Sequence, residues 1–276
     1  MRRMRRGERR PGPAERETLD RIVAFVRHKM DRSSTRTEAF RWGTAVFNED
    51  FPRSYVHNCV RIERTDDLTV DGLIDEADRV LGGAGLDHRL VAVEDGPTGA
   101  LLAPGLREAG WWIGHGEVMV LRRPPDRPAP DGTAREVSWQ EMRPAKERMA
   151  RAEPYATDDE TVRQLVDRRD ATAQAVTVRH FAAFDGDRAV SIADLYQDGD
   201  VAQIEDVWTE PAYRGRGLAR ATVLAAAEAA KPDADLVFLN ADVDDWPKKL
   251  YAKLGFDVVG FEYDFIRWPA GLSPQP

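Results

Sequence analysis

A glycine- and arginine-rich loop between a strand and a long helix is the feature that most constrains the fold of this chain. The stretch TEPAYRGRGLARA, residues 209–221, follows a predicted strand and runs into alanines and leucines. Glycines at 215 and 217 let the backbone approach a ligand closely, and the free N–H groups of a helix's first turn carry partial positive charge. Arg214 and Arg216 add formal charge. The stretch therefore predicts a cradle for a pyrophosphate.

Two other phosphate-binding loops are excluded by their residue patterns. A Walker loop requires a Gly-Lys-Ser/Thr sequence, which does not follow here at the required spacing. A dinucleotide fingerprint requires a third glycine or alanine where Arg220 stands. It also requires a parallel strand–helix–strand unit, where the pattern of this chain indicates hairpins. The remaining pattern is Arg214-x-x-Gly217-x-Ala219.

Periodicity along the chain predicts two similar halves, each mixing helices and strands. In the first half we expect helices at 14–34, 69–81 and 101–112, and strands within 40–64 (including 55–62), at 88–94 and at 116–123. In the second half we expect helices at 138–153, 158–169, 216–230 and 246–255, three antiparallel strands over 176–209, and strands at 235–241 and 258–268.

A proline-rich segment separates the two halves, which align with each other. Residues 124–133 contain four prolines and a glycine, which is typical of a linker. With a shift of 145 residues, Gly110 aligns with Gly255 and Glu117 with Glu262, which indicates a weak internal duplication. We therefore divide the chain into a disordered basic tail (1–13), a first domain (14–123), a linker (124–133) and a second domain (134–276).

Composition limits the class of protein. The chain of 276 residues is 42% hydrophobic and 32% charged, contains no apolar run long enough to span a membrane, and has a net charge of -8. A nucleic-acid partner is not expected, despite six arginines within the first ten residues. The single Cys59 and the lack of a secretory signal favour the cytoplasm. Five histidines without ligand spacing argue against a metal site.

The second half resembles the GNAT superfamily of acyl-CoA-dependent N-acetyltransferases. The resemblance rests on IEDVWTEPAYRGRGLARATVLAAAEAA and on LYAKLGF at 250–256, and it covers roughly residues 134–268. The first half is similar in fold only, because RTDDLTVDGLIDEA stands where the loop should be. The resemblance implies an α/β (α+β) fold of tandem GNAT-like domains, each a mixed, mostly antiparallel sheet flanked by helices, with a degenerate first copy.

The resemblance also implies a site for acetyl-CoA. Strand backbone at Val207, Trp208 and Thr209 would hold the pantetheine and thioester. The pyrophosphate would lie on the loop formed by Arg214, Gly215, Arg216, Gly217, Leu218 and Ala219. Asp244 or Asp245 stands near the position of a cofactor-binding asparagine in the family, with Asp245 taken as the candidate, so the usual contact there is in question. No metal is implied.

Three residues are candidates for proton transfer. An amine acceptor needs a base, and Glu205 is favoured over Asp206. Side chains alternate along a strand, so these two carboxylates are expected on opposite faces. Tyr251 matches a tyrosine that protonates the leaving thiolate in many family members. Trp208 is interpreted either as a wall of the acceptor pocket or as core.

These interpretations together predict an N-acetyltransferase. The acetyl group would pass from acetyl-CoA to a primary amine of a small molecule or peptide, and the first half would shape either the acceptor groove or the contact between the domains. The alternative is an acyl-CoA-binding sensor without turnover. No membrane partner is expected, and a homodimer is left open.

Overall fold

The fold is known from a computed structural model, which describes residues 12–129 and 132–272. The predicted arginine tail lies almost wholly outside these residues. Within the described ranges, no helix has both the length and the apolar character needed to cross a membrane.

The first half contains five strands and three α-helices. Its helices are α1 (Pro13–Arg32), α2 (Val70–Ala77), continued by a π-turn at Asp78–Gly82, and α3 (Gly96–Glu108). Its strands are β1 (Arg36–Phe40), β2 (Gly43–Phe47), β3 (Cys59–Ile62), β4 (Arg89–Val93) and β5 (Trp112–Leu121).

The second half contains six strands and five α-helices. Its helices are α4 (Trp139–Arg151), α5 (Asp159–Asp167), α6 (Arg169–Ala175), α7 (Leu218–Ala230) and α8 (Pro247–Leu254). Its strands are β6 (Ala134–Val137), β7 (Thr177–Asp185), β8 (Arg188–Asp198), β9 (Val201–Thr209), β10 (Leu236–Asp242) and β11 (Phe256–Arg267).

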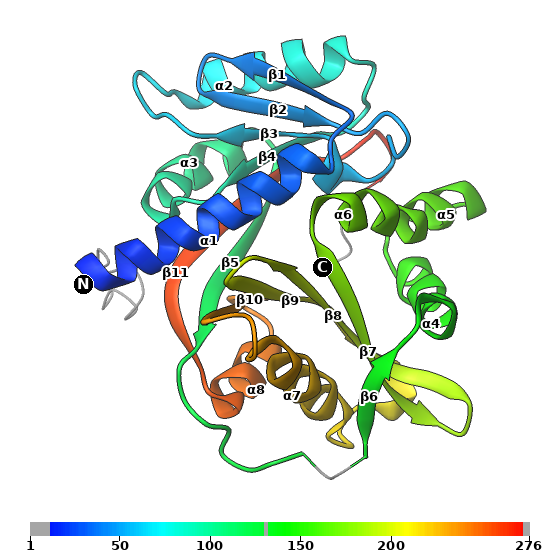
Figure 1. Cartoon of the computed structure of the whole chain (residues 1–276). Coiled ribbons are helices and arrows are strands. Elements are labelled where there is room, and N and C mark those ends of the chain that lie inside the picture. The colour runs from blue at the N-terminus through cyan, green and yellow to red at the C-terminus, as the bar shows by residue number, and fades with distance from the viewer. Residues whose placement is uncertain (1–11, 130–131, 273–276) are drawn as a thin grey trace.

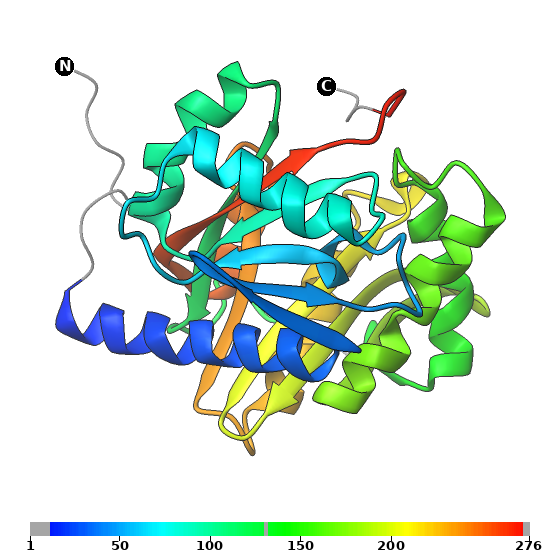
Figure 2. The same cartoon turned by 90° about the horizontal axis from the view of Figure 1, so that it is seen from above.

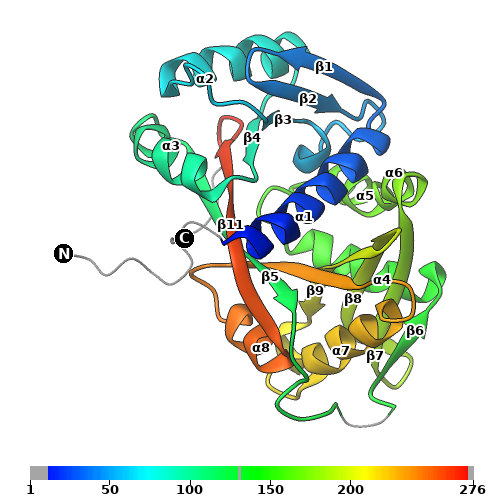
Figure 3. The ribbon, with the colours of Figure 1, turned by 60° about the vertical axis from the view of Figure 1, so that its left-hand side comes forward.

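The eleven strands among the described residues form one sheet, in which the last strand of each half is exchanged. The strand order is β1-β2-β3-β4-β11-β5-β10-β9-β8-β7-β6. Thus β11 pairs with β4 of the first half, β5 pairs with β10 of the second, and β5 and β11 pair with each other at the centre. Figure 3 shows β11 running between the two halves, from α3 to α8. The expected α/β fold of two related, mostly antiparallel halves is confirmed.

Helices cover both faces of the sheet. On one face, α2 and α3 cover the first half, and α7 and α8 cover the second. On the other face, α1 lies across the centre of the sheet, where Ile22 and Phe25 pack on Phe238 and Val118. Figure 1 shows α1 between the two halves, and Figure 2 shows it on the opposite side of the first-half strands from α2. Helix α1 therefore roofs the junction between the halves.

Three sequence expectations differ from the structure. Residues 55–57 form a 3₁₀ turn, not the start of a strand, and the strand begins at Cys59. Strand β6 and helix α6 were not predicted. Most importantly, β9 and β10 are parallel and connected by α7. The expectation that the strands around the glycine loop form only hairpins was therefore wrong. The dinucleotide pattern remains excluded, because it requires a glycine or alanine at position 220 and this chain has the large, buried Arg220 there.

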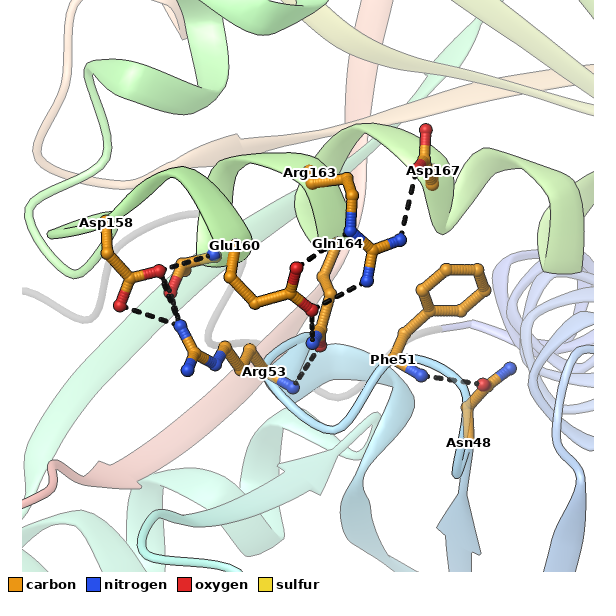
Figure 4. Close-up of polar contacts among 9 residues, drawn as sticks. Asn48, Phe51, Arg53, Asp158, Glu160, Arg163, Gln164 and Asp167 are labelled. Carbon is orange, nitrogen blue, oxygen red and sulfur yellow. Dashed lines mark hydrogen bonds and ion pairs between the residues drawn. The ribbon is translucent and has the colours of Figure 1, made fainter.

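The loop between β2 and β3 reaches across to the second half and contacts α5. The Arg53 side chain donates to Asp158 Oδ2 (2.7 Å) and Thr161 Oγ1 (2.7 Å), and its backbone N–H donates to Gln164 Oε1 (2.9 Å). Figure 4 shows Arg53 lying along α5 in this contact. Tyr55 of the same loop stacks on Tyr155, with ring centroids 4.9 Å apart. The two halves are therefore joined at this edge as well as through the sheet.

Candidate active site

Strands β9 and β10 separate from each other and leave a slot. They pair only over 201–203 with 236–238. Beyond this point β9 continues to Thr209 against β8, and β10 continues to Asp242 against β5. The facing backbone edges, including that of Val207, are therefore unpaired with each other. An extended ligand can add to such an edge as a further strand does.

The glycine loop lies at the end of β9 and leads into α7. Gly215 and Gly217 have φ values of +77° and +80°, and no atom lies within 4 Å of where a Cβ would stand on either. The first backbone bond of the helix is from Ala221 N to Gly217 O (3.1 Å). The N–H groups of 215–220 have no acceptor among the described residues. The Arg214 and Arg216 side chains are exposed. An anion fits this arrangement.

The corresponding helix of the first half starts differently. At α2 the Thr69 side chain accepts a bond from Gly72 N (3.2 Å), and Asp71 follows in the first turn. The cap uses an N–H group that an anion would need, and the aspartate repels negative charge. Only the second half therefore has an open helix start at this position.

A β-bulge places two carboxylates in one cavity. Between β8 and β9, Asp194 pairs with Glu205 and Ile192 pairs with Trp208, so Ala193 lies opposite two residues. Asp206 has a φ of +52° at this bulge. Because the bulge interrupts the alternation of side chains, both Glu205 and Asp206 line the same cavity. The expectation that they point to opposite faces was wrong.

The cavity has a volume of about 430 Å³ and lies between the two halves. Its floor is the sheet, from β9 through β10 to β11 and β4, and its roof is α1 together with α4 and α6. Its charged lining residues are Lys29, Glu94, Lys146, Arg168, Arg169, Asp194, Glu205, Asp206, Glu262 and Asp264. A cavity of this size holds a small molecule.

A buried lysine determines the charge on Asp206. Lys146 of α4 lies 2.6 Å from Asp194 Oδ2 and 2.6 Å from Asp206 Oδ2. Burial favours the neutral form of Asp206, but Lys146 and Arg168 outweigh it and lower its pKa to about 2. Asp206 is therefore a paired anion at neutral pH and is poorly suited to accept a proton.

Glu205 has a different environment. The Lys29 ammonium donates to Gln203 Oε1 (2.7 Å), and the Gln203 amide donates in turn to Glu205 Oε1. Burial raises the pKa of Glu205, the Lys29 charge opposes this rise, and Asp206 adds to it. A carboxylate with a raised pKa and no ion pair closer than 4 Å among the described residues is suited to take a proton near neutral pH.

The remaining sequence candidates lie around the slot. Tyr251 of α8 is buried next to Phe256, and its hydroxyl has no hydrogen-bond partner in the part of the chain that is described. Burial, with Glu205 nearby, raises its pKa. Trp208 packs under α4 with Met142 and does not line the cavity, which favours the core interpretation. Asp245 is exposed and accepts from Trp246 N.

Sequence reasoning missed the half of the cavity that comes from other elements. Lys29 lies on α1 and Glu94 directly after β4, both in the half that lacks the loop, and Lys146 lies on α4. Glu262 gave a signal, because the duplication aligns it with Glu117, and Asp264 was considered as part of an acidic rim that would attract a cationic amine. The elements that carry the others come together only through the exchange of β5 and β11.

Fold and site together define a tandem GNAT protein. Residues 139–256 match the family model described as "Acetyltransferase (GNAT) family". Residues 139–256 therefore form a GNAT domain, and the expected tandem GNAT fold is confirmed. The family and fold support acyl transfer in general.

Solved structures match nearly the whole chain. A GCN5-related N-acetyltransferase from Kribbella flavida is 18% identical, with 96% of this chain and 97% of that chain covered and a TM-score of 0.56. A tandem GNAT protein from the clavulanic acid biosynthesis pathway is 16% identical, with 94% and 96% covered and a TM-score of 0.55. A functionally unknown conserved protein from Staphylococcus epidermidis is 15% identical, with 84% and 93% covered and a TM-score of 0.65. At these identities the likeness shows the fold alone. No curated protein matches the sequence.

Proposed function

We propose that this protein transfers an acetyl group from acetyl-CoA to a primary amine by direct attack, in its second half. The observation that carries the proposal is the slot between β9 and β10, which has the open glycine loop at one end and the cavity with Glu205 beside it. In the proposal, residues 214–219 hold the pyrophosphate and the backbone of 207–209 holds the pantetheine. Asp245 is assigned no role, because its carboxylate is occupied locally.

Each proton in the reaction has a donor and an acceptor. An alkylammonium with a pKa about 3 units above neutral costs about 4–5 kcal/mol to deprotonate, and Glu205 accepts that proton directly or through a water. The amine nitrogen then bonds to the thioester carbon as the carbon–sulfur bond breaks. Tyr251 gives its proton to the thiolate, and the second proton of the nitrogen passes through water to restore the Tyr251 hydroxyl. The proton held by Glu205 is released to solvent. The products are the amide, coenzyme A and one net proton.

The cradle is tested by binding. Replacing Arg214 and Arg216 together by alanine, or Gly217 by aspartate, is expected to weaken acetyl-CoA binding at least tenfold, because charge and close approach are lost. Calorimetric titration measures this. Gly186→Ala is the matched control, since Gly186 also has a positive φ (+57°) and open space but lies in the β7–β8 turn. Unchanged affinity in the loop variants would refute the cradle.

The transfer itself is tested with a panel of amines. Wild type is expected to release coenzyme A in an amine-dependent manner. Tyr251→Phe is expected to lower kcat by about 10²- to 10⁴-fold with acetyl-CoA binding unchanged. The substitution removes one hydroxyl that has no protein partner, so the fold is expected to be retained. Tight acetyl-CoA binding with no turnover on any amine identifies the protein as an acyl-CoA sensor instead.

A further inference from the structure

The end of the cavity that lies away from the slot is lined by three carboxyl groups, and among the described residues two of them have no counter-ion. Glu262 and Asp264 lie on β11 and Glu94 follows the adjacent strand β4, all on the face covered by α1, and Glu94 is the one that is paired, with Arg27 (2.7 Å). Among the described residues, neither Glu262 nor Asp264 has an ion-pair partner within 4 Å. Gly116, opposite Glu262 on β5, makes room for it, because a Cβ there would lie 3.0 Å from Glu262 Cγ.

Two further oxygen atoms in this lining lack a hydrogen-bond donor. Glu94 Oε1 and Asn240 Oδ1 are both buried without a partner, although Glu94 Oε2 accepts from Arg27 (2.7 Å). The Glu94 side chain is only 11% exposed. Buried acceptors without donors are uncommon in folded proteins, because each costs free energy. A ligand that carries several N–H donors satisfies them.

The four cations that line the cavity in the described part of the chain each have a partner other than Glu262 and Asp264. Arg168 donates to Ser54 Oγ (3.3 Å), and Arg169 pairs with Asp170 (3.2 Å). Lys146 is paired with Asp194 and Asp206, on the side toward α4. Lys29 donates to Gln203 and lies over the Tyr196 ring, 4.9 Å from its centroid. Among the described residues, Glu262 and Asp264 on β11 are thus left without a cation within 4 Å, while Glu205 lies at the slot, with β10 and β5 between it and β11.

We propose that the acceptor is a small aliphatic diamine, whose second ammonium binds Glu262, Asp264 and Glu94 while its first amine faces Glu205 and the slot. This rests on the proposed amine acetylation and adds the substrate class. The enclosed volume of about 430 Å³ between the halves favours a small molecule over a protein side chain.

The pKa values of Glu262 and Asp264 in the cavity floor agree with this assignment. Burial and the neighbouring charges of Asp264, Glu205 and Glu94 raise the pKa of Glu262 to about 8, against the opposing effect of Lys29. Burial, with Glu94 and Glu205, raises the pKa of Asp264 to about 6. A bound dication favours the ionised forms, so binding is expected to release protons at neutral pH.

The test compares three acceptors of equal length, namely 1,4-diaminobutane, n-pentylamine and 5-aminopentanoate. We expect kcat/KM to be highest for the diamine by roughly ten- to a hundredfold. This is the effect expected when a substrate gains one hydrogen bond between charged groups. Glu262→Gln with Asp264→Asn is expected to remove this preference, measured as the ratio of kcat/KM for the diamine to kcat/KM for n-pentylamine in the same variant. Asp71→Asn, on exposed α2, is the matched control and keeps the preference.

A binding measurement separates this inference from the proposed function. Calorimetry of 1,4-diaminobutane in buffers of different ionisation enthalpy is expected to show binding with proton release, which the double variant loses. Acetylation of all three acceptors at similar rates overturns the diamine assignment but keeps the transferase. Diamine binding without any acetylation overturns the transferase but keeps the site. Preference for 5-aminopentanoate, or no diamine binding, overturns the inference.

Discussion

Single carboxyl groups in the cavity differ in charge because their neighbours differ. Asp206 touches Lys146 and is held ionised, with a pKa of about 2. Glu262 is buried next to other carboxylates, and its pKa rises to about 8. The same functional group is thus an anion at one end of the cavity and a largely protonated acid at the other.

The raised pKa of Glu262 predicts a dependence of stability on pH. Its unfolded pKa is near 4.5 and its folded pKa near 8, so the folded state binds more protons between these values. The free energy of unfolding is therefore expected to fall as pH rises, and Asp264 has the same sign up to about pH 6. Near pH 6 the slope from Glu262 is about 1.4 kcal/mol per pH unit, and it falls to about half of this at pH 8, where the folded group is half ionised.

Urea unfolding at a series of pH values measures this slope. Glu262→Gln is expected to flatten the curve between pH 6 and 8, because the titrating group is gone. Glu228→Gln, on the exposed face of α7, is expected to keep the wild-type slope. Equal slopes in all three proteins would contradict the assignment.

The sequence predicted the part of the site that is carried by two local motifs. The loop at 214–219, the candidate base Glu205 and Tyr251 were proposed from local motifs, and they surround the slot in the structure. The common orientation of Glu205 and Asp206 was not predictable, because a bulge is a property of strand pairing and leaves no mark in the hydrophobic pattern. Their roles stay predictions until the kinetic tests.

At the scale of elements, the exchanged strands explain why the duplication was visible but incomplete. Strands β5 and β11 pair along most of their length at the centre of the sheet, from Phe256 opposite Leu121 to Ile266 opposite Trp112. Each must fit both halves, which favours retention of similar residues in this pair. Strand β6, at the edge of the sheet, and helix α6 were missed because they are short.

Two aligned glycines give an internally controlled prediction. Gly110 and Gly255 precede β5 and β11 and have φ values of +81° and +102°. A Cβ at Gly110 meets nothing within 4 Å, whereas one at Gly255 would lie 1.9 Å from the Arg123 carbonyl oxygen. Gly110→Ala is expected to cost about 1–2 kcal/mol from backbone strain alone. Gly255→Ala is expected to cost clearly more, measured by urea unfolding.

The two alanine variants test the contact between Gly255 and the Arg123 carbonyl oxygen. Equal losses in the two alanine variants would mean that the contact between Gly255 and Arg123 relaxes without cost. A larger loss at Gly255 supports the tight approach of α8 to the segment that follows β5. Circular dichroism of both variants shows whether the native fold is retained.

At the scale of the molecule, neither half has a complete sheet by itself. Without β5, strand β10 loses its neighbour over residues 238–242, and the core that contains Phe238 loses Val118 and Val120. Without the second half, β4 loses β11. The linker at 124–133 divides the sequence, but the hydrogen bonds of the sheet cross that division.

This exchange predicts that the halves fold only together. A fragment of residues 132–276 expressed alone is expected to be insoluble or to lack cooperative unfolding, because it exposes an apolar strand edge. Co-expression with residues 1–131 is expected to restore a soluble 1:1 complex, measured by size-exclusion chromatography and circular dichroism. A stable, monomeric C-terminal fragment would contradict this expectation.

The strand exchange also limits which parts of such a protein can vary during evolution. The half without a glycine loop cannot be discarded, since its last strand completes the other half's sheet and its β4 and α1 wall the cavity. Substitutions at Glu94 or Lys29 can therefore alter the choice of acceptor and leave the acyl-donor loop untouched. The first half can therefore vary in the residues that recognise the acceptor, whereas the second half must keep the residues that bind the acyl donor.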